Sequence, residues 1–162
     1  MKQILIKARV CHIVFLCVLI FGCSNNDDSY TASTPSTPAA DKRELISAKP
    51  WRYVAWIANP PVKDDNGKLI GDIHNNKPSC DQDDLLIFNA NGNVNFDQGP
   101  TKCDSATPQS SFASWAFIEN ETKLDMANRV YTLDALTATE LKISFDDKVG
   151  NTTHRHTVTF NH

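Results

Sequence analysis

The sequence predicts an all-β domain in which eight antiparallel strands close into an up-and-down barrel, preceded by one short helix. Three observations support this fold class. After Pro50, apolar and β-branched residues occur in eight short runs, residues typical of turns separate these runs, and no segment keeps helical periodicity over three turns. Eight is also a number of strands that closes a small barrel.

The helix is expected over 41–48, because Asp41 can cap its first turn and Glu44 follows at the capping-box spacing. Pro50 should end it. The strands are expected at 51–57, 84–89, 94–98, 112–118, 123–126, 129–134, 140–145 and 154–160. Strands that are neighbours in the sequence should pair with each other, and Trp51 should fill the floor of the barrel.

Turn chemistry supports this order of strands. Asn91-Gly92 supplies the positive φ of a tight turn, 119–122 separates two runs, and 146–151 precedes the last strand. The segment 59–83 contains Pro60-Pro61 and few apolar residues. It is interpreted as one long mobile loop of the kind that covers a barrel mouth.

Alternation along the last strand suggests a ligand site. His154 and His156 share a face with Val158 and Phe160. If this face is the interior, the two imidazoles lie at the open end and meet a ligand's polar head, while its apolar tail lies against Phe145 and Val158. Two alternatives remain: a metal site, which needs a third ligand, and a frayed strand end whose imidazoles reach solvent.

The N-terminus has the pattern of an export signal. Three basic residues precede an apolar run of 12 residues over 10–21, which ends at Gly22-Cys23. This run is too short to span a bilayer comfortably. Ile20-Phe21-Gly22-Cys23 resembles the lipobox of bacterial lipoproteins, and the resemblance implies cleavage before Cys23 and lipidation of that cysteine. The alternative is an ordinary secretory peptide.

The chain therefore divides into a signal peptide at 1–22, a lipidated cysteine with a flexible tether at 23–40, and the barrel domain at 41–162. The tether is rich in Ser, Thr, Asn, Asp, Pro and Ala. Asp27-Asp28 resembles the acidic signal that sends some lipoproteins to the cell surface; the alternative is two solvated acids. We expect a protein anchored by lipid to the outer membrane, at its periplasmic or its surface face.

Charge and motifs exclude several functions. Residues 1–22 hold three of the 16 basic residues and none of the 19 acidic ones, so the remaining chain has a formal charge of −6. Such a chain, without clustered Lys and Arg, is not expected to bind nucleic acid. Nucleophile-elbow, zinc-protease, dinucleotide and phosphate-loop motifs do not occur. We therefore expect no catalytic residues, no cofactor, no metal and no enzymatic activity.

Two cysteines, Cys80 and Cys103, remain after the signal peptide and Cys23 are set aside. In an exported chain a disulfide is the simplest use of such a pair. A zinc site is the rival interpretation, although no Cys-x-x-Cys or His-x-x-x-His spacing supplies the further ligands.

The stretch Cys80-Asp81-Gln82-Asp83-Asp84-Leu85-Leu86-Ile87-Phe88, followed by Asn91-Gly92, Gly99, Lys102-Cys103-Asp104 and Trp115, resembles the lipocalin-like domain of bacterial surface lipoproteins. Leu45-Ile46 and Pro50-Trp51 match the start of that domain. The resemblance covers 41–162. It implies an eight-stranded barrel, a Cys80–Cys103 disulfide and an apolar cavity.

Two functions follow as expectations. The first is a carrier whose barrel binds a small apolar ligand. The second is a non-enzymatic accessory or interaction module that contacts a partner protein or a glycan through its loops. The volume of the interior separates them, because a carrier needs a cavity of several hundred cubic ångströms.

The predicted anchor can be tested by changing Cys23→Ser. Because the thiol is the atom that would carry the lipid, the variant should no longer partition into the detergent phase in Triton X-114 extraction. Partitioning equal to that of the unchanged protein would contradict the anchor.

Overall fold

The computed structural model describes residues 41–162. The predicted signal peptide at 1–22, the lipid acceptor Cys23 and the tether at 24–40 lie outside the described residues. Within the described part of the chain, no helix has the length and apolarity needed to cross a bilayer.

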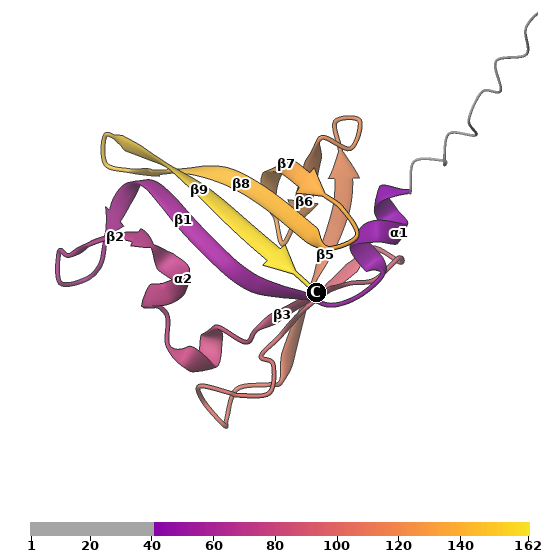
Figure 1. The fold of residues 1–162 in the computed structure, drawn as a ribbon, viewed down its shortest axis with the longest axis horizontal. Helices are drawn as coiled ribbons and strands as arrows, with labels where there is room; N and C mark the ends of the chain where they lie inside the picture. Colours follow the sequence, from indigo (N-terminus) through magenta and orange to yellow (C-terminus); the bar gives the residue numbers. More distant parts are fainter. Residues whose placement is uncertain (1–40) are drawn as a thin grey trace, which may run out of the picture. The chain divides into compact units, whose positions relative to one another are not determined.

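Nine strands form one antiparallel sheet, and eight of them close into an up-and-down barrel (Figure 1). The elements are α1 (Lys42–Ser47), β1 (Trp51–Lys63), β2 (Leu69–Asp72), α2 (Ile73–Asn76), the 3₁₀ turn η1 (Ser79–Asp81), β3 (Leu85–Phe88), β4 (Asn93–Asp97), β5 (Ser110–Ile118), β6 (Lys123–Met126), β7 (Arg129–Leu136), β8 (Glu140–Val149) and β9 (Thr152–Asn161). From β3 onward each strand pairs with the next, and β1 pairs with both β3 and β9. The predicted fold class and its eight strands are confirmed, and β2 is an additional strand on β1.

The pairing of β1 with β9 closes the barrel. Its register places Trp56 opposite Val158 and Ala58 opposite His156. Because side chains alternate along a strand, β9 turns His154, His156, Val158 and Phe160 to the same side. These four residues are 7 %, 5 %, 4 % and 0 % exposed, so that side is the barrel interior.

One end of the barrel is filled by apolar side chains and by α1. Asp41 caps α1 as predicted, accepting a hydrogen bond from the Arg43 backbone N–H at 2.7 Å. Ile46 and Trp51 are fully buried, and the Trp51 indole N–H donates to the Ile46 carbonyl oxygen at 2.7 Å. The expected position of Trp51 in the barrel floor is therefore confirmed.

The opposite end is the barrel mouth. The strand registers show which segments lie at this end: the last residues of β4, the first residues of β5, the β6–β7 turn and the β8–β9 turn. Figure 1 shows β1, β8 and β9 extending away from α1 toward it. The segment from β2 to η1 also lies on this side, because β2 pairs with the last residues of β1.

The segment 59–83 is not the single long loop that the sequence predicted, because β1 continues to Lys63 and is followed by β2, α2 and η1. Pro60-Pro61 is tolerated within β1, since it falls where the β1–β2 register is interrupted. Two aspartate side chains stabilise the turn after β1 and the start of α2 by hydrogen bonds to backbone N–H groups. Asp64 accepts from the backbone N–H groups of Asn66 and Lys68, and Asp72 caps α2.

The predicted turn at 146–151 is also shorter in the structure. β8 runs to Val149 and β9 begins at Thr152, so Gly150 and Asn151 alone connect them. Gly150 has a φ of 61°, which suits a tight hairpin. The polar run before Gly150 is strand, because its residues pair with β9 as far as Val149 opposite Thr152.

Gly99 provides a test of the loop packing at the mouth. Gly99 and Gly150 have nearly the same φ, 62° and 61°, but a Cβ at Gly99 would collide with the Asp83 backbone, whereas one at Gly150 would meet nothing within 4 Å. Gly150→Ala should cost about 1 kcal/mol from the left-handed backbone alone. Gly99→Ala should lower the melting temperature further, because Asp83 must also move. Equal losses in thermal denaturation would contradict this packing.

Candidate functional site

A cavity of about 100 Å³ lies in the mouth half of the barrel interior. It is lined by Tyr53, Trp56, Met126, Arg129, Tyr131, Ile143, Phe145, Val158 and Phe160. Apart from Arg129, these side chains are aromatic or aliphatic. None of the described residues that line the cavity carries a carboxylate.

Only two of the four residues predicted to bind a ligand lie at the cavity. Phe145 and Val158 line the cavity, whereas His154 and His156 do not, although both imidazoles are buried on the same inner face. His154 Nδ1 lies 2.8 Å from the Pro60 carbonyl oxygen. Alternation along the last strand therefore predicts the correct face but not the contacts that occupy the two imidazoles.

His156 belongs to an aromatic cluster behind the cavity wall. Its ring stacks on Phe145 with centroids 4.7 Å apart and planes 6° from parallel. The Trp56 indole N–H donates to His156 Nδ1 at 3.0 Å. Burial lowers the pKa of His156, and the nearby Asp147 opposes this shift. An imidazole that accepts through Nδ1 and loses solvation is therefore neutral at pH 7.

Two of the residues that line the cavity are tyrosines. Tyr53 and Tyr131 are half-buried, and among residues 41–162 neither hydroxyl has a hydrogen-bond partner. Burial raises the pKa of Tyr53 well above its usual range, and the nearby Tyr131 and Asp84 raise it further. Burial also raises the pKa of Tyr131, against the opposing charge of Arg129. Both phenols therefore stay protonated and can donate hydrogen bonds.

Two cations lie over the aromatic rings of this region. The Arg129 guanidinium carbon is 4.5 Å from the ring centroid of Phe145. Lys77 Nζ lies 5.4 Å from the centroid of Tyr53 and 5.3 Å from that of Trp56. Within the described chain, neither cation forms a salt bridge. Ring faces therefore compensate part of both charges, and Asp84 lies close enough to feel the charge of Lys77.

A second, larger pocket of about 410 Å³ lies beside the cavity, and Tyr53 lines both. Besides Tyr53, Phe96 and Lys77, its wall contains four carboxylates, from Asp81, Asp84, Asp97 and Asp104. Loss of solvation raises the pKa of Asp84, and Asp81 raises it further, while Lys77 opposes both. We call this the mouth pocket; the charged side chains of its wall are four acids and one lysine.

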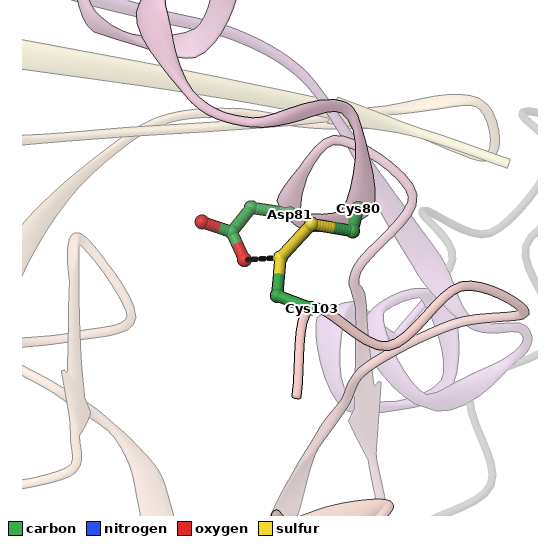
Figure 2. Close-up of side chains that lie close together, drawn as sticks. All are labelled: Cys80, Asp81 and Cys103. Atoms are coloured by element: carbon green, nitrogen blue, oxygen red, sulfur yellow. Dashed lines mark hydrogen bonds between the residues drawn. A yellow bond between two sulfur atoms is a disulfide. The ribbon is translucent and has the colours of Figure 1, made fainter. Parts of the chain in front are cut away.

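The Cys80–Cys103 disulfide joins η1 to the loop after β4 (Figure 2). Cys103 also lines the mouth pocket. Asp81 Oδ1 lies 3.0 Å from Cys103 Sγ. A disulfide sulfur carries no proton, so this is a polar contact rather than a conventional hydrogen bond. The same bond removes the thiolates that a zinc ion would need, so the expected disulfide is present and the rival zinc pair is not.

Sequence reasoning missed Tyr53, Lys77, Arg129 and Tyr131 as site residues. A signal existed for two of them, because alternation along 129–134 puts Arg129 and Tyr131 on one face. Lys77 gave no such signal. It follows α2, in a segment whose helix and strand depend on tertiary contacts.

The buried imidazole predicts a pH dependence of stability. Because the pKa of His156 is lower in the folded than in the unfolded protein, the unfolded state binds the proton first as pH falls below about 6.5. Stability should therefore decrease from pH 7 toward pH 5. His156→Gln keeps an acceptor for Trp56 but cannot titrate, so its melting temperature should fall less over this range. Parallel melting profiles for the two proteins would contradict the assignment.

Comparison with known proteins adds no assignment to this site. No family model and no curated protein matches the chain. What the site can do therefore has to be inferred from its own geometry and chemistry.

Proposed function

We propose that the protein is a non-enzymatic lipoprotein of the outer membrane or cell surface whose lipocalin-like barrel binds a small ligand at its mouth. One observation carries this proposal: a largely apolar cavity inside the closed barrel is lined by Tyr53 and Tyr131, whose hydroxyls have no hydrogen-bond partner among residues 41–162, and it adjoins a larger pocket at Tyr53. Concave, mostly apolar sites with a few polar groups are typical of small-molecule binding.

The volumes of the two pockets limit the size of the ligand. Pockets for drug-sized ligands measure roughly 300 to 1,000 Å³, and an apolar cavity of about 150 Å³ holds benzene. The interior cavity, at about 100 Å³, is smaller than this, so it holds part of an aromatic ring or one short apolar group and not a long acyl chain. The rest of a larger ligand would occupy the mouth pocket of about 410 Å³.

The anchor and the location are part of the proposal and rest on the lipobox-like sequence that ends at Cys23. A tether of the composition found after Cys23 would hold the barrel away from the membrane. The −6 charge of the chain after residue 22 favours solubility in the aqueous layer next to the membrane.

The second candidate function is an accessory module that contacts a partner protein or a glycan through its loops. The small interior volume favours it, because most of the barrel is filled by side chains rather than open to a ligand. In this alternative the loops at the mouth would form the contact surface.

Binding can be tested with the neutral fluorescent probe N-phenyl-1-naphthylamine and two matched variants. Val158→Phe adds a ring to a residue that lines the cavity, whereas Val130→Phe makes the same change at a residue that is 48 % exposed. We expect the full chain to bind the probe with micromolar affinity, Val158→Phe to weaken binding about tenfold or more, and Val130→Phe to change it little.

Thermal denaturation of both variants would check that they remain folded. Absence of probe binding by the unchanged protein would overturn the carrier function and leave the accessory module. Equal binding by the unchanged protein and by Val158→Phe would place the bound probe outside the cavity.

A further inference from the structure

The polar groups at the interior cavity can all donate hydrogen bonds. Arg129 has N–H donors and cannot accept a hydrogen bond. The protonated hydroxyls of Tyr53 and Tyr131 have no hydrogen-bond partner within residues 41–162. No carboxylate from the described chain lines this cavity. Such a set of donors matches the oxygen atoms of an anion better than it matches an amine.

The two cations near the cavity are available to a ligand. Arg129 and Lys77 form no salt bridge with the described residues, and each lies over the face of a ring in the cavity wall. A guanidinium can hold both oxygens of a carboxylate at once, which gives orientation as well as attraction. Because Arg129 lies over Phe145, a carboxylate held by Arg129 would leave the ligand's body next to aromatic walls.

The acidic wall of the mouth pocket restricts the total charge of the ligand. Asp81 and Asp84 lie on that wall, and loss of solvation together with neighbouring acids raises the pKa of Asp84. A second negative charge on the ligand would face these carboxylates and be repelled. Arg129 in the cavity therefore favours a ligand with one carboxylate, and the acids of the mouth pocket disfavour a second carboxylate on the same ligand.

From these contacts we propose that the cavity binds a compact monocarboxylic acid, with its carboxylate against Arg129 and its apolar body against Trp56 and Phe145. This inference rests on the proposed ligand-binding function and specifies the chemical class of the ligand. Tyr53 and Tyr131 would donate to the same carboxylate. Lys77 would add attraction at the rim.

The test compares four probes that differ in charge on one ring: benzoate, benzyl alcohol, benzylamine and phthalate. Affinities are measured for the full chain by displacement of N-phenyl-1-naphthylamine or by isothermal titration calorimetry. We expect benzoate to bind tightest, and benzylamine and phthalate to bind at least about tenfold more weakly. The affinity for benzoate should also fall as salt rises from 20 to 300 mM, because salt screens the attraction.

Matched variants identify the cation. Arg129→Gln should weaken benzoate about tenfold and leave benzyl alcohol within about twofold, since only the charged contact is lost. Arg52→Gln removes a cation that is exposed on the outer side of β1 and outside any salt bridge of the described chain, so it should change neither affinity.

The possible failures are distinguishable. If benzylamine binds tighter than benzoate, or if Arg129→Gln leaves the affinity for benzoate unchanged, the carboxylate assignment is overturned while the ligand-binding barrel stands. If none of the four compounds and no N-phenyl-1-naphthylamine bind, the proposed function itself falls and takes this inference with it.

Discussion

The register between β1 and β9 is the constraint on which the rest of this structure depends. It closes the sheet into a barrel and, at the same time, decides which side chains of both strands face inward. With Trp56 opposite Val158, both side chains reach the cavity, and with Ala58 opposite His156 the imidazole is buried beside Trp56. A shift of one residue would turn these groups outward and empty the interior of its aromatic cluster.

The closed interior explains the chemistry of the mouth. The floor is filled by Trp51, Phe160 and their neighbours, whereas the interior cavity lies where the strands extend past the floor toward the mouth. Burial there keeps His156 neutral and Tyr53 protonated, since each charged form would lose solvation. Charges occur at the rim, where Lys77 and Arg129 lie over rings and remain partly hydrated.

Much of the barrel could be predicted because its signals are local. Short alternating runs and turn residues identified the eight strands, and alternation placed His154 and His156 inside. The bulge between Tyr53 and Ala55 could not be predicted in this way. Strict alternation from Trp51 would bury Ile57, yet after the bulge Trp56 and Ala58 face inward and Ile57 is 41 % exposed. The position of Lys77 over Trp56 and the cavity volume depend on tertiary packing, which no single segment encodes.

The closing register can be measured directly by nuclear Overhauser effects between backbone protons of β1 and β9. The account predicts cross-strand effects between Trp56 and Val158 and between Ala58 and His156, because opposite residues of an antiparallel pair have Cα atoms about 4.5 to 5.5 Å apart. Strong Hα–Hα or HN–HN effects displaced by one residue, such as one between Ala58 and Thr157, would contradict it. An absence of any cross-strand effect between β1 and β9 would show that the sheet is open and that the interior site does not exist.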